Sequence, residues 1–150
     1  MELAVAEAFT GMRVNHGGPF GAAIVRNGQV VATAHNEVIK TNDPTAHAEI
    51  LAIRRASAKL KTFDLSACEI YATCEPCPMC LAAILWARIP CVYYGCTRQD
   101  AEGIGFRDSL FYDIMGGMKT AGILKISRLG RRECLKALRE WIRKTDRTPY

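Results

Sequence analysis

The stretches His47-Ala48-Glu49 and Pro76-Cys77-Pro78-Met79-Cys80 decide how the rest of this chain is interpreted. Together they supply one imidazole, two thiols and one carboxylate. A structural zinc usually takes four protein ligands, whereas a catalytic zinc takes three and keeps a position for water beside a proton carrier. The composition therefore predicts a catalytic zinc held by His47, Cys77 and Cys80, with Glu49 left to move protons.

Both stretches are expected at the first turn of a helix. Residues 42–45, Asn-Asp-Pro-Thr, join a proline break to capping residues, so a helix is predicted over about residues 46–60. A second helix is predicted over residues 77–87. A proline at its start is compatible with a helix, because the first amide hydrogens of a helix have no internal acceptor. Cys77 and Cys80 then share a face, and the positive helix end favours the metal-binding thiolate. We expect both helix N-termini to face one ion.

The surrounding pattern predicts an α/β chain. Two apolar, β-prone runs flank Asn27-Gly28, which is the favoured pair of a type I′ turn and indicates a hairpin. Strands and helices then alternate, as in an α/β layer with crossover connections. A loop from residue 97 precedes a short helix near residues 107–115. The predicted helices cover residues 2–14, 46–60, 77–87, 107–115 and 131–144, and the predicted strands cover residues 20–26, 29–35, 68–73, 91–95 and 123–127.

Length and composition fit one globular domain over residues 1–150. The chain is 49% hydrophobic and 23% charged, with no low-complexity segment, so it should fold throughout. Its longest strongly apolar run, residues 80–87, is far below the ~20 residues that span a bilayer, so no membrane insertion is expected. Seven cysteines are an odd number and no signal-peptide pattern opens the chain, which favours a reducing cytoplasm over a disulfide framework.

The net charge of +5 is concentrated towards the end of the chain. Leu135, Leu138, Trp141 and Ile142 recur between the charges at helical spacing, so we favour a solvated helix face over a track for nucleic-acid phosphates. The basic residues of this cluster are Arg128, Arg131, Arg132, Lys136, Arg139, Arg143, Lys144 and Arg147.

Other interpretations of the cysteines and histidines remain open. Cys77 and Cys80 alone could form a redox pair, and Cys74 could be the fourth ligand of a structural zinc, but neither explains Glu49 beside His47. His16 and His35 are isolated in the sequence, and we expect each to be an ordinary hydrogen-bonded histidine. We expect the remaining cysteines to be core residues; they are Cys68, Cys91, Cys96 and Cys134.

The two motifs resemble those of the cytidine-deaminase-like superfamily of zinc enzymes, and the resemblance covers nearly the whole chain. It implies a three-layer α/β/α fold with a central mixed five-stranded sheet. Within the superfamily the chain is most similar to bacterial guanine deaminases, because residues 102–112 match their pattern of acidic residue, glycine, phenylalanine, acidic residue, serine and tyrosine. The sequence also ends in Tyr150, as those enzymes do. Residues 42–49 and 74–80 are equally similar to tRNA adenosine deaminases.

The resemblance also implies roles for individual residues. Asn36 would hold the base edge, Phe20 would pack on the ring, and Ala46 would line the substrate site. Asp108 would assist Glu49 in proton transfer. Tyr150 would close the site, from the partner chain of a homodimer whose C-terminal segments are exchanged.

The implied reaction is hydrolysis of guanine to xanthine and ammonia in the cytoplasm, with Zn²⁺ as cofactor. A deaminase of guanosine, cytosine or a triazine amine uses the same chemistry, and Arg107 is a basic departure from the family pattern. An adenosine deaminase acting on tRNA is the first alternative. A deaminase-like binding module with a structural zinc is the second.

Overall fold

The computed structural model describes residues 1–116 and residue 135. The chain divides into a compact unit, Met1–Asp113, and a second unit, Ile114–Tyr150. The strand and helix predicted over residues 123–127 and 131–144 lie outside the described residues, apart from residue 135 itself, and so do Cys134 and Tyr150. That residues 1–150 form one domain therefore stays a prediction.

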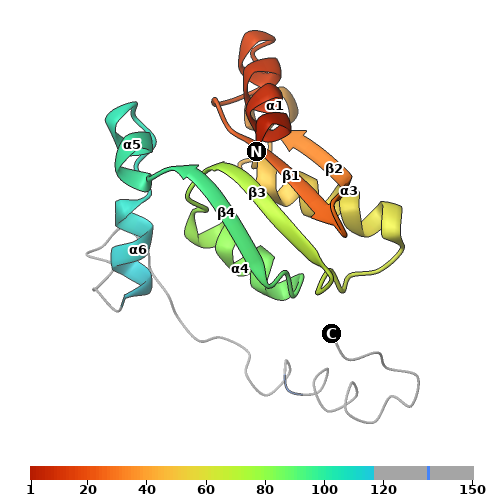
Figure 1. Ribbon diagram of the computed structural model, residues 1–150. Helices are drawn as coiled ribbons and strands as arrows, with labels where there is room; N and C mark the ends of the chain where they lie inside the picture. The colour runs from red at the N-terminus through yellow and green to blue at the C-terminus, as the bar shows by residue number, and fades with distance from the viewer. Residues whose placement is uncertain (117–134, 136–150) are drawn as a thin grey trace. The chain divides into compact units, whose positions relative to one another are not determined.

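The described strands form one mixed sheet in the order β2-β1-β3-β4 (Figure 1). β1 pairs antiparallel with both β2 and β3, whereas β3 and β4 are parallel and are joined by a helical crossover. Of the five strands implied by the resemblance, the structure describes four, and the fifth was predicted over residues 123–127. The bounds are β1 Gly21–Arg26, β2 Gln29–His35, β3 Cys68–Cys74 and β4 Cys91–Cys96.

The predicted hairpin is confirmed. Asn27 and Gly28 have φ angles of 52° and 75°, and positive φ at both central residues is what a type I′ turn requires. Arg26 therefore pairs directly with Gln29 across the turn. The hairpin carries the chain back along the sheet and ends β2 at His35, next to Asn36.

Helices cover both faces of the sheet, as a three-layer α/β/α fold requires. α1 (Glu2–Arg13) packs on the face that includes Gly21, where a Cβ would overlap the backbone of Ala4. Alternate residues of β1, Ala22 and Ile24, point to the opposite face and join the core beneath α3 (Ala48–Leu60) and α4 (Pro78–Trp86). Because side chains alternate between the two faces along β1, this strand packs against the helices on both sides of the sheet.

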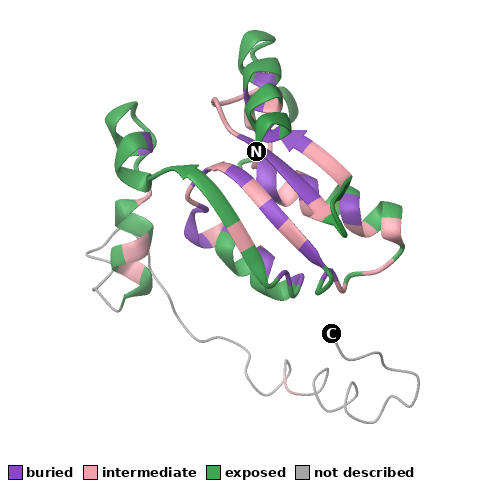
Figure 2. Cartoon of the chain, viewed as in Figure 1, coloured by how far each residue is buried: buried purple, intermediate pink, exposed green. Residues whose placement is uncertain are grey.

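The core between the sheet and α3 consists largely of small side chains. Ala48, Ala52 and Ala56 recur every four residues on one face of α3 and are fully buried. Figure 2 shows the matching buried stripe along β1 and β3. Because alanine side chains are small, α3 can pack closely on the sheet. α3 is also in contact with α4.

Two short helices lie in segments that were predicted to be loops. α2 (Val38–Thr41) begins where the Val38 amide donates to Asn36 Oδ1 at 3.2 Å. α5 (Arg98–Gly103) is started by a capping box between Thr97 and Asp100. Both helices begin at hydrogen bonds to local side chains, which leave no hydrophobic periodicity, and this explains why the sequence pattern missed both. α6 (Ser109–Met115) is close to its predicted range.

The edge strand β4 corrects part of the cysteine prediction. Cys68 on β3 is buried, as expected, but Cys91 and Cys96 on β4 are exposed, since β4 has no neighbour on its outer side among the described strands. All six cysteines in the described part of the chain are free thiols. No helix within that part is both long and apolar enough to cross a membrane.

Candidate zinc and base-binding site

The three predicted ligands come together at two helix N-termini. His47 is the N-cap of α3 and Cys77 is the N-cap of α4, which begins at Pro78 as expected. His47 Nδ1 lies 3.6 Å from Cys77 Sγ and 3.5 Å from Cys80 Sγ. All three donor atoms lie within 4.8 Å of one another. Two thiols and an imidazole are common zinc ligands, so the donor set fits this metal.

The electrostatics of the two thiols also suit metal binding. Hydrogen bonds from Cys80 and then His47 lower the pKa of Cys77 to about 4, so that Cys77 is a thiolate at neutral pH. The hydrogen bond with Cys77, together with burial, raises the pKa of Cys80. The Cys77 thiolate in turn raises the pKa of His47. The protons shared among these groups are those that a metal ion displaces when it binds.

Cys74 does not belong to the ligand cluster. Its thiol donates to the Thr97 carbonyl at 3.5 Å, and burial raises its pKa to about 11. The only described residues grouped with Cys77 are His47 and Cys80. The structure therefore opposes the alternative of a four-ligand structural zinc that includes Cys74.

Two carboxylic acids lie beside the ligands. Glu49 is only 8% exposed, and burial raises its pKa above the ordinary value, which suits a group that both takes and gives a proton near neutral pH. Asp108 is partly buried just before α6, and burial followed by the Cys77 charge raises its pKa as well. Both carboxylic acids line the same cavity as His47 and Cys77.

That cavity has a volume of about 500 Å³ and is the candidate substrate pocket. Asn36 and Phe20 line it, as the resemblance implied. Ala46 is 1% exposed and is not among the lining residues; its carbonyl instead accepts from the Glu37 amide at 2.9 Å. The pocket thus joins an apolar ring, a side-chain amide and the acidic groups beside the metal ligands.

Two aromatic residues at the site, Phe106 in the pocket wall and Tyr112 beside the cysteine motif, were given no role from the sequence. The Phe106 ring packs edge-on against Phe20, with centroids 4.8 Å apart, and both rings line the pocket. The Tyr112 hydroxyl donates to the Pro76 carbonyl at 2.9 Å and ties α6 to the cysteine motif. Phe106 and Tyr112 both lie within residues 102–112, the stretch whose pattern resembles guanine deaminases. A sequence motif, however, does not show which side chains are in contact in the fold.

Gly17 follows the first helix, and it lines the pocket together with Asn36. A Cβ added at Gly17 would overlap Asn36 Oδ1. We expect Gly17→Ala to push the Asn36 amide aside and to raise KM for the base more than it lowers kcat, by about tenfold if the equivalent of one hydrogen bond to substrate is lost. Steady-state kinetics will measure the changes in KM and kcat separately.

Gly103→Ala is a matched control for this substitution, because a Cβ there meets nothing within 4 Å. It should leave both constants within about twofold, as expected of an exposed surface change. An unchanged KM in Gly17→Ala would show that Asn36 does not contact the substrate.

Comparisons with known proteins agree with this geometry. Residues 1–96 match the family described as the cytidine and deoxycytidylate deaminase zinc-binding region. Guanine deaminase of Bacillus subtilis is 48% identical over 112 residues, which is 75% of this chain and 72% of that protein. A solved structure of guanine deaminase from Bacillus subtilis superposes with a TM-score of 0.94 at 39% identity, over 99% of this chain and 95% of that one.

Two further proteins mark the breadth of the similarity. The tRNA-specific adenosine deaminase of Aquifex aeolicus is 44% identical over 86 residues, 57% of each chain. A protein solved in complex with 2,6-diaminopurine has a TM-score of 0.68 at 35% identity, over 71% of this chain and 60% of that one. With its ligand triad, its buried glutamate and these matches, the chain belongs to the zinc-binding cytidine and deoxycytidylate deaminase family.

Proposed function

We propose that this chain is a zinc-dependent aminohydrolase that converts guanine and water to xanthine and ammonia. The observation that carries the proposal is one pocket that brings Glu49 and the ligands His47 and Cys77 together with Asn36 and Phe20. The similarity to guanine deaminase over three quarters of the chain supports the purine base as substrate.

The chain's own residues account for the proton transfers. When bound by His47, Cys77 and Cys80, zinc supplies a water whose pKa is lowered from ~15.7 towards ~7. Glu49 accepts a proton from this water and delivers it to the ring nitrogen beside the attacked carbon. Glu49 then takes the second proton of the water from the new hydroxyl on that carbon and carries it to the amine; the carbon–nitrogen bond breaks, ammonia leaves and a carbonyl remains. Because it is buried at the pocket wall, it can serve both steps without losing the proton to solvent.

The remaining pocket residues orient the base. Asn36 offers an amide donor and acceptor to the base edge, and the Phe20 ring, held edge-on by Phe106, covers the ring face. Asp108, whose pKa is raised, assists the transfer to the leaving amine. Ala46 supports the wall through its carbonyl contact with the Glu37 amide.

A panel of substrates tests this assignment. Purified protein should release ammonia from guanine faster than from guanosine, cytosine, triazine amines or adenosine in tRNA, with Glu49→Gln as the inactive control. Activity on another free base but not on guanine would reject the substrate and keep the reaction class. Inactivity on the whole panel in a zinc-loaded protein would favour a binding module.

An adenosine deaminase acting on tRNA is the second candidate, favoured by the 44% identity to the Aquifex aeolicus enzyme. It predicts tRNA binding that weakens steeply with salt, because phosphate contacts release counterions. All the residues of the basic cluster that would make those contacts lie outside the described part of the chain. Turnover of guanine that is indifferent to added tRNA would exclude this candidate.

The proposal includes a cytoplasmic homodimer in which Tyr150 closes the partner's pocket. Mixing Glu49→Gln chains with Tyr150→Ala chains tests this arrangement. If Tyr150 acts across the interface, half the dimers gain one intact site, and the mixture recovers about a quarter of native activity. If Tyr150 acts within its own chain or not at all, the mixture shows only the average of the two variants.

A further inference from the structure

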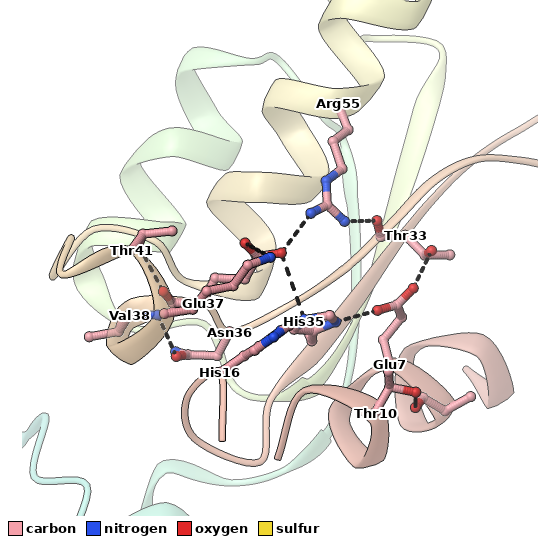
Figure 3. Close-up of polar contacts among 12 residues, drawn as sticks. Glu7, Thr10, His16, Thr33, His35, Asn36, Glu37, Val38, Thr41 and Arg55 are labelled. Atoms are coloured by element: carbon pink, nitrogen blue, oxygen red, sulfur yellow. Dashed lines mark hydrogen bonds and ion pairs between the residues drawn. The ribbon is translucent and has the colours of Figure 1, made fainter. Parts of the chain in front are cut away.

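A second cluster of potential metal ligands lies away from the zinc ligands, formed by His16, His35 and Glu37. His16 Nδ1 is 2.9 Å from His35 Nε2, and His35 Nε2 is 3.7 Å from Glu37 Oε1 (Figure 3). The three donor atoms lie within 4.8 Å of one another, as those of the first cluster do. The two histidines were expected to be isolated, so the fold, and not the sequence spacing, creates this group.

His35 is held with a fixed tautomer. Its Nδ1 lies 2.7 Å from Glu7 Oε2, and a carboxylate can only accept, so Nδ1 carries the proton and the lone pair of a neutral ring is on Nε2. Burial by itself raises the pKa of Glu7. Hydrogen bonds from Thr33 and His35 outweigh this effect and keep that pKa below its usual value. Metal-binding histidines characteristically donate their other ring nitrogen to a carboxylate.

The His35 ring also has little freedom to turn. Gly11 of α1 lies so close that a Cβ there would be 2.5 and 2.6 Å from two atoms of the His35 ring. His35 is 9% exposed at the end of β2. Nε2 is therefore held towards His16, from whose Nδ1 it accepts a hydrogen bond at 2.9 Å, and a metal ion would replace that proton between two nitrogens that are already in position.

The other two ligands sit on segments that are already joined. The His16 carbonyl accepts from the amides of Ile39 and Lys40, both at 3.0 Å, which brings the loop after α1 against α2. Glu37, 7% exposed, is the N-cap residue of that helix. His16, His35 and Glu37 thus come from three segments that meet at one point.

The carboxylate of Glu37 is ionised and held by cations. Lys40 donates to Oε2 at 3.0 Å and Arg55 donates to Oε1 at 2.9 Å. Burial by itself raises the pKa of Glu37, but the contacts with Lys40 and Arg55 outweigh this effect and lower that pKa overall. Carboxylate ligands of metals are themselves commonly hydrogen-bonded by outer groups. The two positive charges nevertheless oppose a divalent cation, so they set the affinity below that of a site with thiolates.

We propose that His16, His35 and Glu37 form a second site for a divalent transition metal, independent of the proposed deaminase reaction. Two imidazoles and one carboxylate suit zinc and its neighbours, and leave a fourth position for water. An ion there crosslinks the loop that carries Gly17 to the strand end that carries Asn36. It is a structural brace behind the pocket wall, and its ligands do not face the substrate.

Metal analysis of the untagged full-length chain tests the site. After loading with Zn²⁺ and desalting, the native protein should hold about two zinc ions per chain, whereas His35→Gln should hold about one. Lys40→Met is the matched control: it removes a cation beside Glu37 but no ligand, so the second equivalent should be retained and should be released at higher chelator concentration than in the native chain.

Cobalt distinguishes the two sites by their donor atoms. Titration of metal-free protein with Co²⁺ should give thiolate-to-cobalt charge-transfer absorption for the first equivalent only, because the second site has no sulfur. Cys80→Ser should abolish that absorption and keep the second equivalent, so failure of the proposed deaminase site would not conceal this one. His16→Leu provides a second ligand deletion if His35→Gln does not fold.

Two results would overturn the proposal. A native chain that takes up only the thiolate-bound equivalent would show that the cluster is a hydrogen-bond network alone. A second equivalent that persists in both His35→Gln and His16→Leu would place the extra ion elsewhere on the protein.

Discussion

Glu49→Gln is expected to lower ammonia release from guanine by about 10²–10⁴ in kcat, equivalent to about 3–5 kcal/mol in activation free energy. The amide has nearly the same shape, so the buried side chain keeps its place, but it cannot accept and return a proton. Zinc content should be unchanged, because the three ligands are untouched. Stopped assays with metal analysis of the same sample will measure both quantities.

Glu75→Gln is the matched control for this substitution. Glu75 also lines the pocket, but its carboxylate accepts the Arg98 backbone amide at 3.1 Å, a bond that glutamine can keep. Its kcat should stay within about twofold of native. An active, zinc-loaded Glu49→Gln protein would contradict the proton-transfer role and would require another group to carry the protons.

Cys80→Ser is expected to abolish stable zinc binding, and turnover with it. Altering an outer partner of a metal ligand typically costs 10–100-fold in affinity, so removing a fully buried ligand should weaken zinc by more than about 100-fold. The loss should appear as one zinc ion fewer per chain than in the native protein after purification. Added zinc should restore little activity.

Cys74→Ser separates loss of a ligand from loss of a thiol in the same region. Cys74 is also buried, but its raised pKa keeps it a neutral thiol, and it donates to a carbonyl, which serine can do as well. The variant should retain one equivalent of zinc in the His47–Cys77–Cys80 site. Loss of that zinc in Cys74→Ser would restore the four-ligand structural site as the better description.

The grouping of the candidate catalytic residues could be predicted because each is part of a local motif. The spacing of Cys77 and Cys80 places both on one face of a helix start, and His47 and Glu49 occupy the equivalent turn of α3. The hairpin could likewise be predicted, since Asn27-Gly28 encodes its turn without help from the rest of the chain. In these places the interactions that determine the geometry span only a few residues.

The pocket wall and the second cluster depended on contacts between distant segments. Neither the edge-on packing of Phe20 with Phe106 nor the closeness of Gly17 to Asn36 leaves a periodic signal in the sequence. The same is true of the meeting of His16 with His35, which requires β2 to end beside the loop after α1. Hydrophobic pattern predicts which face of an element is buried, but not which element it meets.

By itself, the sequence predicted the three candidate zinc ligands, the proposed proton carrier and the alternation of strands and helices, because helix starts, turns and motifs are properties of neighbouring residues. Only the tertiary structure decided that β3 lies antiparallel to β1 and parallel to β4, that Cys74 is separate from the ligand cluster, and that two histidines expected to be isolated lie within 4.8 Å of each other and of one carboxylate. The physical reason is that these arrangements are determined by side-chain packing and hydrogen bonds between elements, whose free energies are small individually and are set by the whole fold.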